Sequence, residues 1–333
     1  MTVKGQSLID RIGTNEIISL LLVSVALLVP IYATNAAVIS LFTQILIALM
    51  GALSVYIMLR MDLMSFAVPA FMAVGGYSVA IVSARYDVTD VFALTAVSLI
   101  VPMVIALPIG ALILRLRGVY FVLVTFVIAE IMPLLLFETP TLTGGSNGIS
   151  GLPPVIFLGM PIEDNNKILL MTTVLAIVAV LGTIGLTRYY RHQFDAIKEN
   201  ELLAQSLGLT IWRYKVIGFC AAAGLAGLGG FCLVEMLITA HPSSFQAISS
   251  VNYVAYTVVG GQGALLGAVV GSALLVWASN LFSLQGEYSQ GLFGILLMLA
   301  VLFAKGGLIG SLQGVFSRGR RFVPVGRSRG AEA

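Results

Sequence analysis

Long apolar runs constrain this sequence more than any other feature. A helix that spans a bilayer needs roughly 17–25 mostly apolar residues, because the hydrocarbon core is about 30 Å thick. Seven runs meet this condition clearly, and they cover residues 17–33, 36–59, 63–84, 91–114, 119–137, 168–187 and 216–240. None of them alternates apolar and polar residues as a membrane strand does. The sequence therefore predicts an all-α polytopic membrane protein.

The low charge content excludes the main soluble classes. Only 10% of the 333 residues are charged and 59% are hydrophobic, whereas a soluble domain has about 25% charged residues. Too few charged side chains are present to cover the surface of a soluble fold of this length. An ordinary soluble enzyme, a disordered chain and a disulfide scaffold are all excluded.

The number of membrane crossings follows from the distribution of lysines and arginines between the two sides of the membrane. After residue 240 the runs are short (245–260), full length (265–284) and short again (290–304). With ten crossings and a cytoplasmic N-terminus, only Arg85 and Lys167 of the 18 lysines and arginines lie outside, as the positive-inside rule requires. If 245–260 were a re-entrant loop, nine crossings would place the basic tail, residues 312–333, outside. We therefore predict about ten transmembrane helices with both termini cytoplasmic.

The first run could instead be a cleavable signal peptide. Against this interpretation, the segment before it contains Asp10 and Glu16, and no clean small-x-small cleavage site follows. We expect residues 17–33 to remain as a span.

Two runs are interrupted at equivalent places. Residues 63–84 carry Pro69 and a Gly-Gly pair, and residues 245–260 follow Pro242 and end in another Gly-Gly pair. As the third and eighth spans, they predict two inverted five-helix halves. Paired interrupted segments of this kind indicate a transport site, although Gly and Pro are also simply common in membrane helices.

Two glycine series predict close helix packing, because glycines three or four residues apart share one helix face and let a neighbouring backbone approach. They are Gly224, Gly227 and Gly230, and Gly263, Gly267 and Gly271.

The longest inner connection, residues 188–215, carries a helical pattern. Ala196, Ile197, Leu203, Ala204 and Leu207 recur at helical spacing and form a narrow apolar face. Gly208 then suits the left-handed end of a helix. We expect a short surface helix over roughly residues 194–208. It either lies on the lipid surface or docks into a groove of a cytoplasmic partner.

At this loop the sequence resembles a known family. Glu201, Ala204 and Gly208 resemble the coupling loop of ABC importer permeases, in particular the LivM-type permeases of branched-chain amino acid importers. Residues 116–131, Thr143-Gly-Gly-Ser-Asn-Gly148 and residues 258–263 resemble other family segments in matching order. Together they span most of the chain from about residue 63 to residue 307.

The resemblance implies a type II ABC importer permease, with residues 1–333 as a single transmembrane permease domain in a bacterial cytoplasmic (inner) membrane. Such a chain pairs with a second homologous permease, two cytoplasmic ATPase subunits and an extracytoplasmic solute-binding protein. ATP and Mg would bind the ATPase subunits, and no cofactor would bind this chain. In agreement, the sequence lacks a G-x-x-x-x-G-K-[ST] phosphate loop, and we predict no enzyme activity. The coupling residues implied here are Ala196, Glu199, Glu201, Ala204 and Gly208.

The outer connection, residues 138–167, is rich in turn residues. We expect it either to cap the pathway entrance and meet the binding protein or to serve as a passive linker. The residues that match the family's outer-loop signature are Thr143, Gly144, Gly145, Asn147 and Gly148.

The expected translocation pathway includes the interrupted third span and the two acids within spans. Acids inside a bilayer are costly and usually face a pathway or a partner, although a structural role is equally open for each. The family usually has Gly where this chain has Asp62 and Ala67, which points to an unusual solute. The predicted pathway residues are Ser65, Phe66, Phe71, Tyr77, Glu130 and Glu235.

The chain is predicted to form half of the translocation pathway for branched-chain or related apolar amino acids. Members of the same family that import urea, amides or aromatic and organic acids are alternatives. A stand-alone ion-coupled carrier is an alternative of another class.

His192 and His241 fall on opposite sides of the membrane and cannot share a metal. The basic tail suits anionic membrane lipid, so the net charge of +3 does not indicate a nucleic-acid partner.

Overall fold

The computed structural model describes residues 13–32, 35–157 and 159–283, together with residues 291, 294, 295 and 298. Helices dominate this part of the chain, and four short strands lie in its connections. The helices, including two 3-10 turns labelled η, are α1 (Thr14–Val25), α2 (Val29–Tyr32), α3 (Ala36–Leu59), α4 (Val68–Tyr86), α5 (Val91–Ile113), α6 (Val119–Phe137), α7 (Pro140–Thr143), η2 (Gly145–Asn147), α8 (Asn165–Tyr189), α9 (Arg191–Glu199), α10 (Glu201–Ser206), α11 (Ile211–Leu237), η3 (Pro242–Phe245), α12 (Ser249–Gly261) and α13 (Leu265–Ser283). The strands are β1 (Ile149–Ser150), β2 (Val155–Phe157), β3 (Met160–Ile162) and β4 (Thr239–Ala240).

Seven helices of the described chain are long and apolar enough to cross a membrane: α3, α4, α5, α6, α8, α11 and α13. They coincide with seven of the predicted runs and confirm an all-helical polytopic membrane protein. The predicted run 290–304 lies almost entirely outside the described residues. The total of ten crossings therefore stays a prediction.

The first predicted run does not form one continuous helix. α1 ends at Val25, a turn follows, and α2 begins at Val29. Pro30 is the second residue of α2, and proline has no N–H to continue a helical ladder from the preceding turn. The run is thus divided into two helices, and its retention as a span stays a prediction. α1 nevertheless belongs to the bundle, where it packs on α8 and α13 and where Glu16 pairs with Arg188 of α8.

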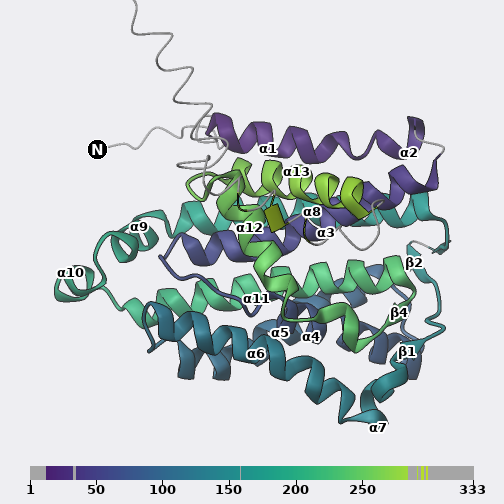
Figure 1. The fold of residues 1–333 in the computed structure, drawn as a ribbon, viewed down its shortest axis with the longest axis horizontal. Coiled ribbons are helices and arrows are strands. Elements are labelled where there is room, and N and C mark those ends of the chain that lie inside the picture. The colour runs from purple at the N-terminus through teal and green to yellow at the C-terminus, as the bar shows by residue number, and fades with distance from the viewer. Residues whose placement is uncertain are drawn as a thin grey trace, which may run out of the picture.

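The bundle is arranged around α3 and α11, which contact each other (Figure 1). α11 also packs against α4 and α5, which contact one another. α3 packs in the same way against α12 and α13, which again contact one another. Two similar three-helix units therefore meet along the α3–α11 contact.

The connections between helices gather at two opposite ends of the bundle. α9 and α10 project from one end, and α7, β1 and β4 lie at the other (Figure 1). At the α9–α10 end, Arg60 and Arg117 pair with residues of these two helices. At the other end, Arg85 donates to the backbone carbonyls of Thr141 and Leu142. The chain thus alternates between the two ends as the predicted succession of spans requires.

Glycines bring helix backbones into contact at the centre of the bundle. A Cβ on Gly75 of α4 would collide with the backbone of Gly227 of α11, and one on Gly230 would collide with the carbonyl of Met72. Likewise, Gly267 and Gly271 of α13 lie against the backbone of α12. Close packing is confirmed for both predicted series, except that Gly263 has no neighbour within 4 Å of a built Cβ.

The interrupted third span has a simple local cause. Residues 63–67 are not helical, and α4 begins at Val68 with Pro69 in its first turn. Asp62, just before this segment, has a φ of 56°, a left-handed conformation that glycine adopts most easily. The glycine that the family resemblance implies at this position would adopt the same conformation without strain.

Candidate functional site

The inner connection forms two short helices rather than one. α9 and α10 are separated by Asn200, whose backbone is extended (φ −160°, ψ 104°). The side chain of Asn200 accepts a hydrogen bond from the Leu203 N–H at 3.1 Å and caps α10. The prediction of a single helix over residues 194–208 was therefore wrong. The predicted left-handed helix end is confirmed, since Gly208 has a φ of 90°.

The break at Asn200 divides the predicted apolar face. Phe194, Ile197 and Ala204 are buried toward the bundle, and Ala196 is half-buried. The two leucines of α10 and the leucine that caps its end point outward instead. Leu202, Leu203 and Leu207 are 64%, 57% and 80% exposed. We refer to these three side chains as the leucine surface.

Glu201 fastens the second helix to the bundle. Its carboxylate lies 2.9 Å from the ammonium of Lys215 on α11 and 3.3 Å from the guanidinium of Arg117, just before α6. Lys215 is only 2% exposed, so its charge depends on this carboxylate for compensation. Sequence reasoning identified Glu201 but missed Lys215 and Arg117, because both were explained by the positive-inside rule alone.

A second ion pair fastens the first helix. Asp195 of α9 lies 2.5 Å from the guanidinium of Arg60 at the end of α3, and 3.7 Å from that of Arg191. Glu199, a predicted coupling residue, is exposed. Between the two helices and the bundle lies a cavity of about 370 Å³, bounded by residues 61–63, 117–118 and 197–202. The inner connection is thus anchored to α3, α6 and α11 while one side of it stays uncovered.

The predicted pathway residues of the third span lie in or next to the α4–α11 contact. Phe71 is buried edge-on against Phe219 of α11, with ring centroids 5.4 Å apart. The ring of Tyr77 packs near that of Phe245 in η3, with ring centroids 6.1 Å apart. Within the described chain, the buried hydroxyl of Tyr77 has no hydrogen-bond partner.

Ser65 and Phe66 precede α4. The Ser65 side chain is buried and lies 3.4 Å from the Ala67 N–H, which donates to it. The Phe66 N–H donates to the Thr125 hydroxyl of α6 at 3.1 Å. This segment is therefore tied to α6.

The two intramembrane acids are placed very differently. Glu235 is buried on α11, at 8% exposure. Glu130 is exposed on α6, in a row with Val127 and Leu134, which are 50% and 61% exposed. The structure therefore does not bring Glu130 and Glu235 into one site.

The outer-loop signature forms an ordered turn rather than an open linker. The Thr143 hydroxyl donates to the carbonyls of Leu136 and Thr139 and accepts from the Gly145 N–H at 3.2 Å. Gly144, Gly145 and Gly148 all have positive φ. Asn147 is exposed on this turn.

This turn is joined to the second half of the chain. β1 pairs antiparallel with β4, and a Cβ on Gly148 would collide with the carbonyl of Ala240. The His241 ring lies 2.9 Å from the Ser146 carbonyl through Nε2. Sequence reasoning missed this role of His241, since a contact between residues far apart in the chain leaves no local pattern.

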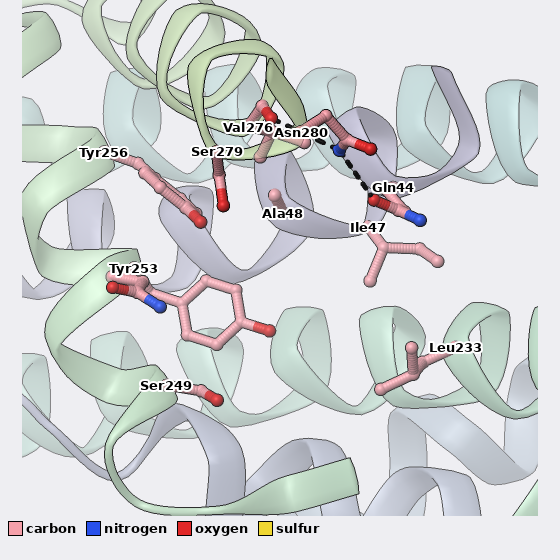
Figure 2. Close-up of a pocket in the computed structure, with 11 residues that line it drawn as sticks. Gln44, Ile47, Ala48, Leu233, Ser249, Tyr253, Tyr256, Val276, Ser279 and Asn280 are labelled. Atoms are coloured by element: carbon pink, nitrogen blue, oxygen red, sulfur yellow. Dashed lines mark hydrogen bonds between the residues drawn. The ribbon is translucent and has the colours of Figure 1, made fainter. Parts of the chain in front are cut away.

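A further cavity lies within the bundle between α3, α11, α12 and α13 (Figure 2). Several amide and hydroxyl side chains line it, among them Gln44, Asn252 and Asn280. Sequence reasoning did not predict any of these three residues as part of a site. The signal that could have identified them is the presence of amide side chains inside long apolar runs.

Comparison with known proteins identifies the family. The profile described as branched-chain amino acid transport system / permease component matches residues 37–302. The chain is 28% identical over 263 residues to the high-affinity branched-chain amino acid transport system permease protein LivM of Salmonella typhimurium, with 72% of this chain and 62% of that protein covered. The same values hold for LivM of Escherichia coli K12.

A more distant similarity links the chain to the ribose import permease protein RbsC of Bacillus subtilis, at 29% identity over 154 residues, 44% of this chain and 46% of that protein. No solved structure matches the chain. The chain spans about three-fifths of the length of the LivM proteins. Since the family profile covers most of the chain, the protein belongs to the family of branched-chain amino acid transport system permease components.

Proposed function

We propose that this chain forms half of the translocation pathway of an ATP-driven importer for branched-chain or related apolar amino acids. The observation that carries the proposal is the inner unit of α9 and α10. It exposes three leucines while ion pairs hold it to three membrane helices. A carrier that works alone would have no use for such a unit.

In this proposal the leucine surface enters a groove of a cytoplasmic ATPase subunit. ATP and Mg bind to that subunit and not to this chain. Ala196 and Ala204 provide the close packing behind the leucines, Glu199 lies at the exposed rim, and Gly208 ends the second helix. Glu201 passes the movement of α10 to α11 through Lys215.

The transmembrane region is proposed to consist of two inverted halves. In support, α4 and α5 pack on α11 as α12 and α13 pack on α3, which is the pattern expected if α3–α5 and α11–α13 are equivalent. The remaining spans of a ten-crossing topology would be the N-terminal segment, α6, α8 and a last helix beyond residue 283. Both termini are then cytoplasmic.

The partners proposed are a second homologous permease, two ATPase subunits and an extracytoplasmic solute-binding protein, in a bacterial inner membrane. Glu130 supports a partner on α6, because an ionisable side chain is costly when it faces lipid. We assign Ser65, Phe66, Phe71, Tyr77 and Glu235 to the region of the α4–α11 contact that moves during transport. The ordered turn of Thr143 to Gly148 would receive the binding protein.

The test is purification of the chain from its native host with identification of co-purifying subunits, followed by ATP-driven uptake of L-leucine in proteoliposomes. Co-purification of an ATPase and leucine uptake would support the proposal. Uptake of urea or an organic acid in place of leucine would identify another solute of the same family. Isolation without any ATPase would reject the coupling role of α9 and α10.

A further inference from the structure

The unit formed by α4, α5 and α11, which we refer to as the α11 unit, is held together by direct backbone contact. A Cβ on Gly75 of α4 would collide with the backbone of Gly227, and one on Gly227 would collide with the Ser98 carbonyl of α5. A Cβ on Gly230 would collide with the Met72 carbonyl of α4. Glycines at such contacts let membrane helices pack closely. Because the backbones themselves meet, the three helices are locked to one another.

The unit formed by α3, α12 and α13, the α3 unit, is held by hydrogen bonds between helices. The buried Thr257 hydroxyl of α12 donates to the Ala52 carbonyl of α3 at 3.1 Å. The Asn280 amide of α13 donates to Gln44 of α3 at 3.1 Å (Figure 2). In addition, Gly271 of α13 lies against the backbone of α12. Interhelical hydrogen bonds and small residues both stabilise contacts between membrane helices, so this unit is locked as well.

The contact between the two units is of a different kind. At Gly218 and Gly229 of α11, the nearest groups of α3 and of the residues directly after it are the side chains of Met61 and Met50. Methionine has three rotatable bonds and adapts to irregular and changing surroundings. The α3–α11 contact can therefore absorb a small displacement that the contacts inside each unit resist.

The inner connection has one ion-paired helix for each unit. α9 continues from α8, which packs on α3, and Asp195 of α9 lies 2.5 Å from the Arg60 guanidinium at the end of α3. α10 leads into α11, and the Glu201 carboxylate lies 2.9 Å from the Lys215 ammonium of α11. The Arg60 and Lys215 side chains are 17% and 2% exposed. Both links are thus shielded from water, where an ion pair is stronger than on an open surface.

Asn200 forms a joint between the two helices. Its extended backbone ends α9, and its side chain caps α10. A residue at the end of an element is where a change of angle between two elements is absorbed. Aromatic packing does not separate the helices, because the Tyr190 ring before α9 meets both Phe194 of α9 and Tyr214 of α11. The two ion pairs are therefore what assigns one helix to each unit.

We infer that the inner connection is a two-armed coupling element, in which the Asp195–Arg60 pair moves the α3 unit and the Glu201–Lys215 pair moves the α11 unit. A change of angle between α9 and α10 at Asn200 then displaces one unit against the other along the α3–α11 contact. Asp195 and Arg60 are positioning residues in this scheme. The inference rests on the proposed function, to which it adds a second arm and the movement that the arms produce.

The first test uses the complete transporter in proteoliposomes and measures ATP hydrolysis and L-leucine uptake on the same vesicles. Asp195→Asn removes the charge of the α9 arm and keeps the size of the side chain. Asp195→Glu keeps the charge and is the rescue variant. Asp164→Asn is the matched control, because the Asp164 side chain is 74% exposed and precedes α8, away from the inner connection. Thermal unfolding midpoints show whether each variant is folded.

The second test measures the movement itself with pairs of spin labels. Tyr86→Cys on α4 together with Leu281→Cys on α13 reports a distance between the two units. Tyr86→Cys together with Leu112→Cys on α5 reports a distance within the α11 unit. All three side chains are exposed. Distances are measured by pulsed electron paramagnetic resonance on the complex without nucleotide and after trapping with ATP and vanadate, and the parent chain, with Cys220 and Cys232 buried, gives the background.

We expect Asp195→Asn to hydrolyse ATP but to lower the uptake per ATP hydrolysed by about fivefold or more, since coupling between two sites typically corresponds to factors of about 5–150. Asp195→Glu and Asp164→Asn should match the parent. The distance between the units should change on trapping in the parent and stay constant in Asp195→Asn. The distance within the α11 unit should stay constant in both.

Parental uptake per ATP by a folded Asp195→Asn protein would overturn the inference. So would a distance within the α11 unit that changes as much as the distance between the units. If Asp195→Asn does not fold, the two distances in the parent decide. A parent complex that hydrolyses ATP without importing leucine would reject the proposed solute, and the distances would again decide the inference alone. A chain that binds no ATPase would reject the proposed function and the two arms together.

Discussion

At the residue scale, the structure changes the interpretation of Glu201 more than that of any other predicted site residue. The family resemblance places it in the coupling loop, where its charge would be expected to face the ATPase subunit. In the structure its carboxylate turns inward and lies between Lys215 and Arg117. Glu201 therefore holds α10 on the bundle, and under the proposed function the leucine surface makes the contact with the partner.

Replacement of Glu201 by glutamine should destabilise the inner connection. The ammonium of Lys215, which is 2% exposed, would lose its carboxylate, and loss of one partner of a buried ion pair costs up to about 3–5 kcal/mol. We expect a lower thermal unfolding midpoint in detergent and ATP hydrolysis that no longer drives uptake. The exposed Glu199 supplies the control, since Glu199→Gln should leave the midpoint unchanged.

The double variant Glu201→Leu/Lys215→Met separates charge from packing. It removes both charges, so it should recover most of the stability that Glu201→Gln loses. Equal stability of Glu201→Gln and the parent would show that the ion pair does not hold the helix.

At the element scale, helix positions could be predicted from the sequence and helix breaks could not. The ends of α3 and α6 agree with the predicted runs, because a spanning helix needs an apolar stretch about as long as the hydrocarbon core is thick. The break between α9 and α10 was missed, although it has a local signal. Asn200 is a good N-cap and Glu201 follows it in the first turn, and the apolar periodicity across the break concealed both.

The contact between α4 and α11 should tolerate no added side chain. A Cβ on Gly75 would overlap the backbone of Gly227, and overpacking typically costs about 1–3 kcal/mol or more. Gly75→Ala should therefore lower the thermal midpoint and the yield of monodisperse protein on size-exclusion chromatography. Gly182→Ala on α8 is the control, because nothing lies within 4 Å of its built Cβ. A Gly75→Ala protein as stable as this control would contradict the packing described.

The leucine surface should be needed for ATPase binding and not for folding. Leu203→Ser and Leu207→Ser change side chains that are 57% and 80% exposed, so the thermal midpoint of the isolated chain should stay close to the parental value. Co-purification of the ATPase subunits should fall about tenfold or more, as expected when apolar anchors of an interface are removed. Undiminished co-purification of both variants would place the docking surface elsewhere.

At the scale of the whole molecule, the sequence predicted the two ends of the bundle but not the arrangement between them. The distribution of basic residues separated Arg85 from Arg60 and Arg117, and the structure places them accordingly. Neighbouring helices could not be deduced, because helices that are apolar on every side give no periodic signal. Only the glycine series marked particular contacts. The cavity could not be predicted either, since its wall combines Gln44, Leu233, Asn252 and Asn280 from four different helices.

The orientation in the membrane can be tested with single cysteines. Met160, at 70% exposure, lies at the β1–β4 end, and Ser206 is exposed on α10. A membrane-impermeant maleimide should label Met160→Cys in intact spheroplasts and Ser206→Cys only after permeabilisation. The buried Cys220 and Cys232 should leave the parent unlabelled. Labelling of Ser206→Cys from outside would reverse the proposed topology.

The central claim, that this chain is a pathway subunit driven from its α9–α10 end by an ATPase, is tested most directly by reconstitution with and without the ATPase subunits. Proteoliposomes that contain the chain, its partner permease, the ATPase subunits and the binding protein should accumulate L-leucine only when ATP is present. Vesicles that lack the ATPase subunits should show no accumulation under a proton or sodium gradient. Accumulation driven by an ion gradient in vesicles that contain this chain alone would contradict the account.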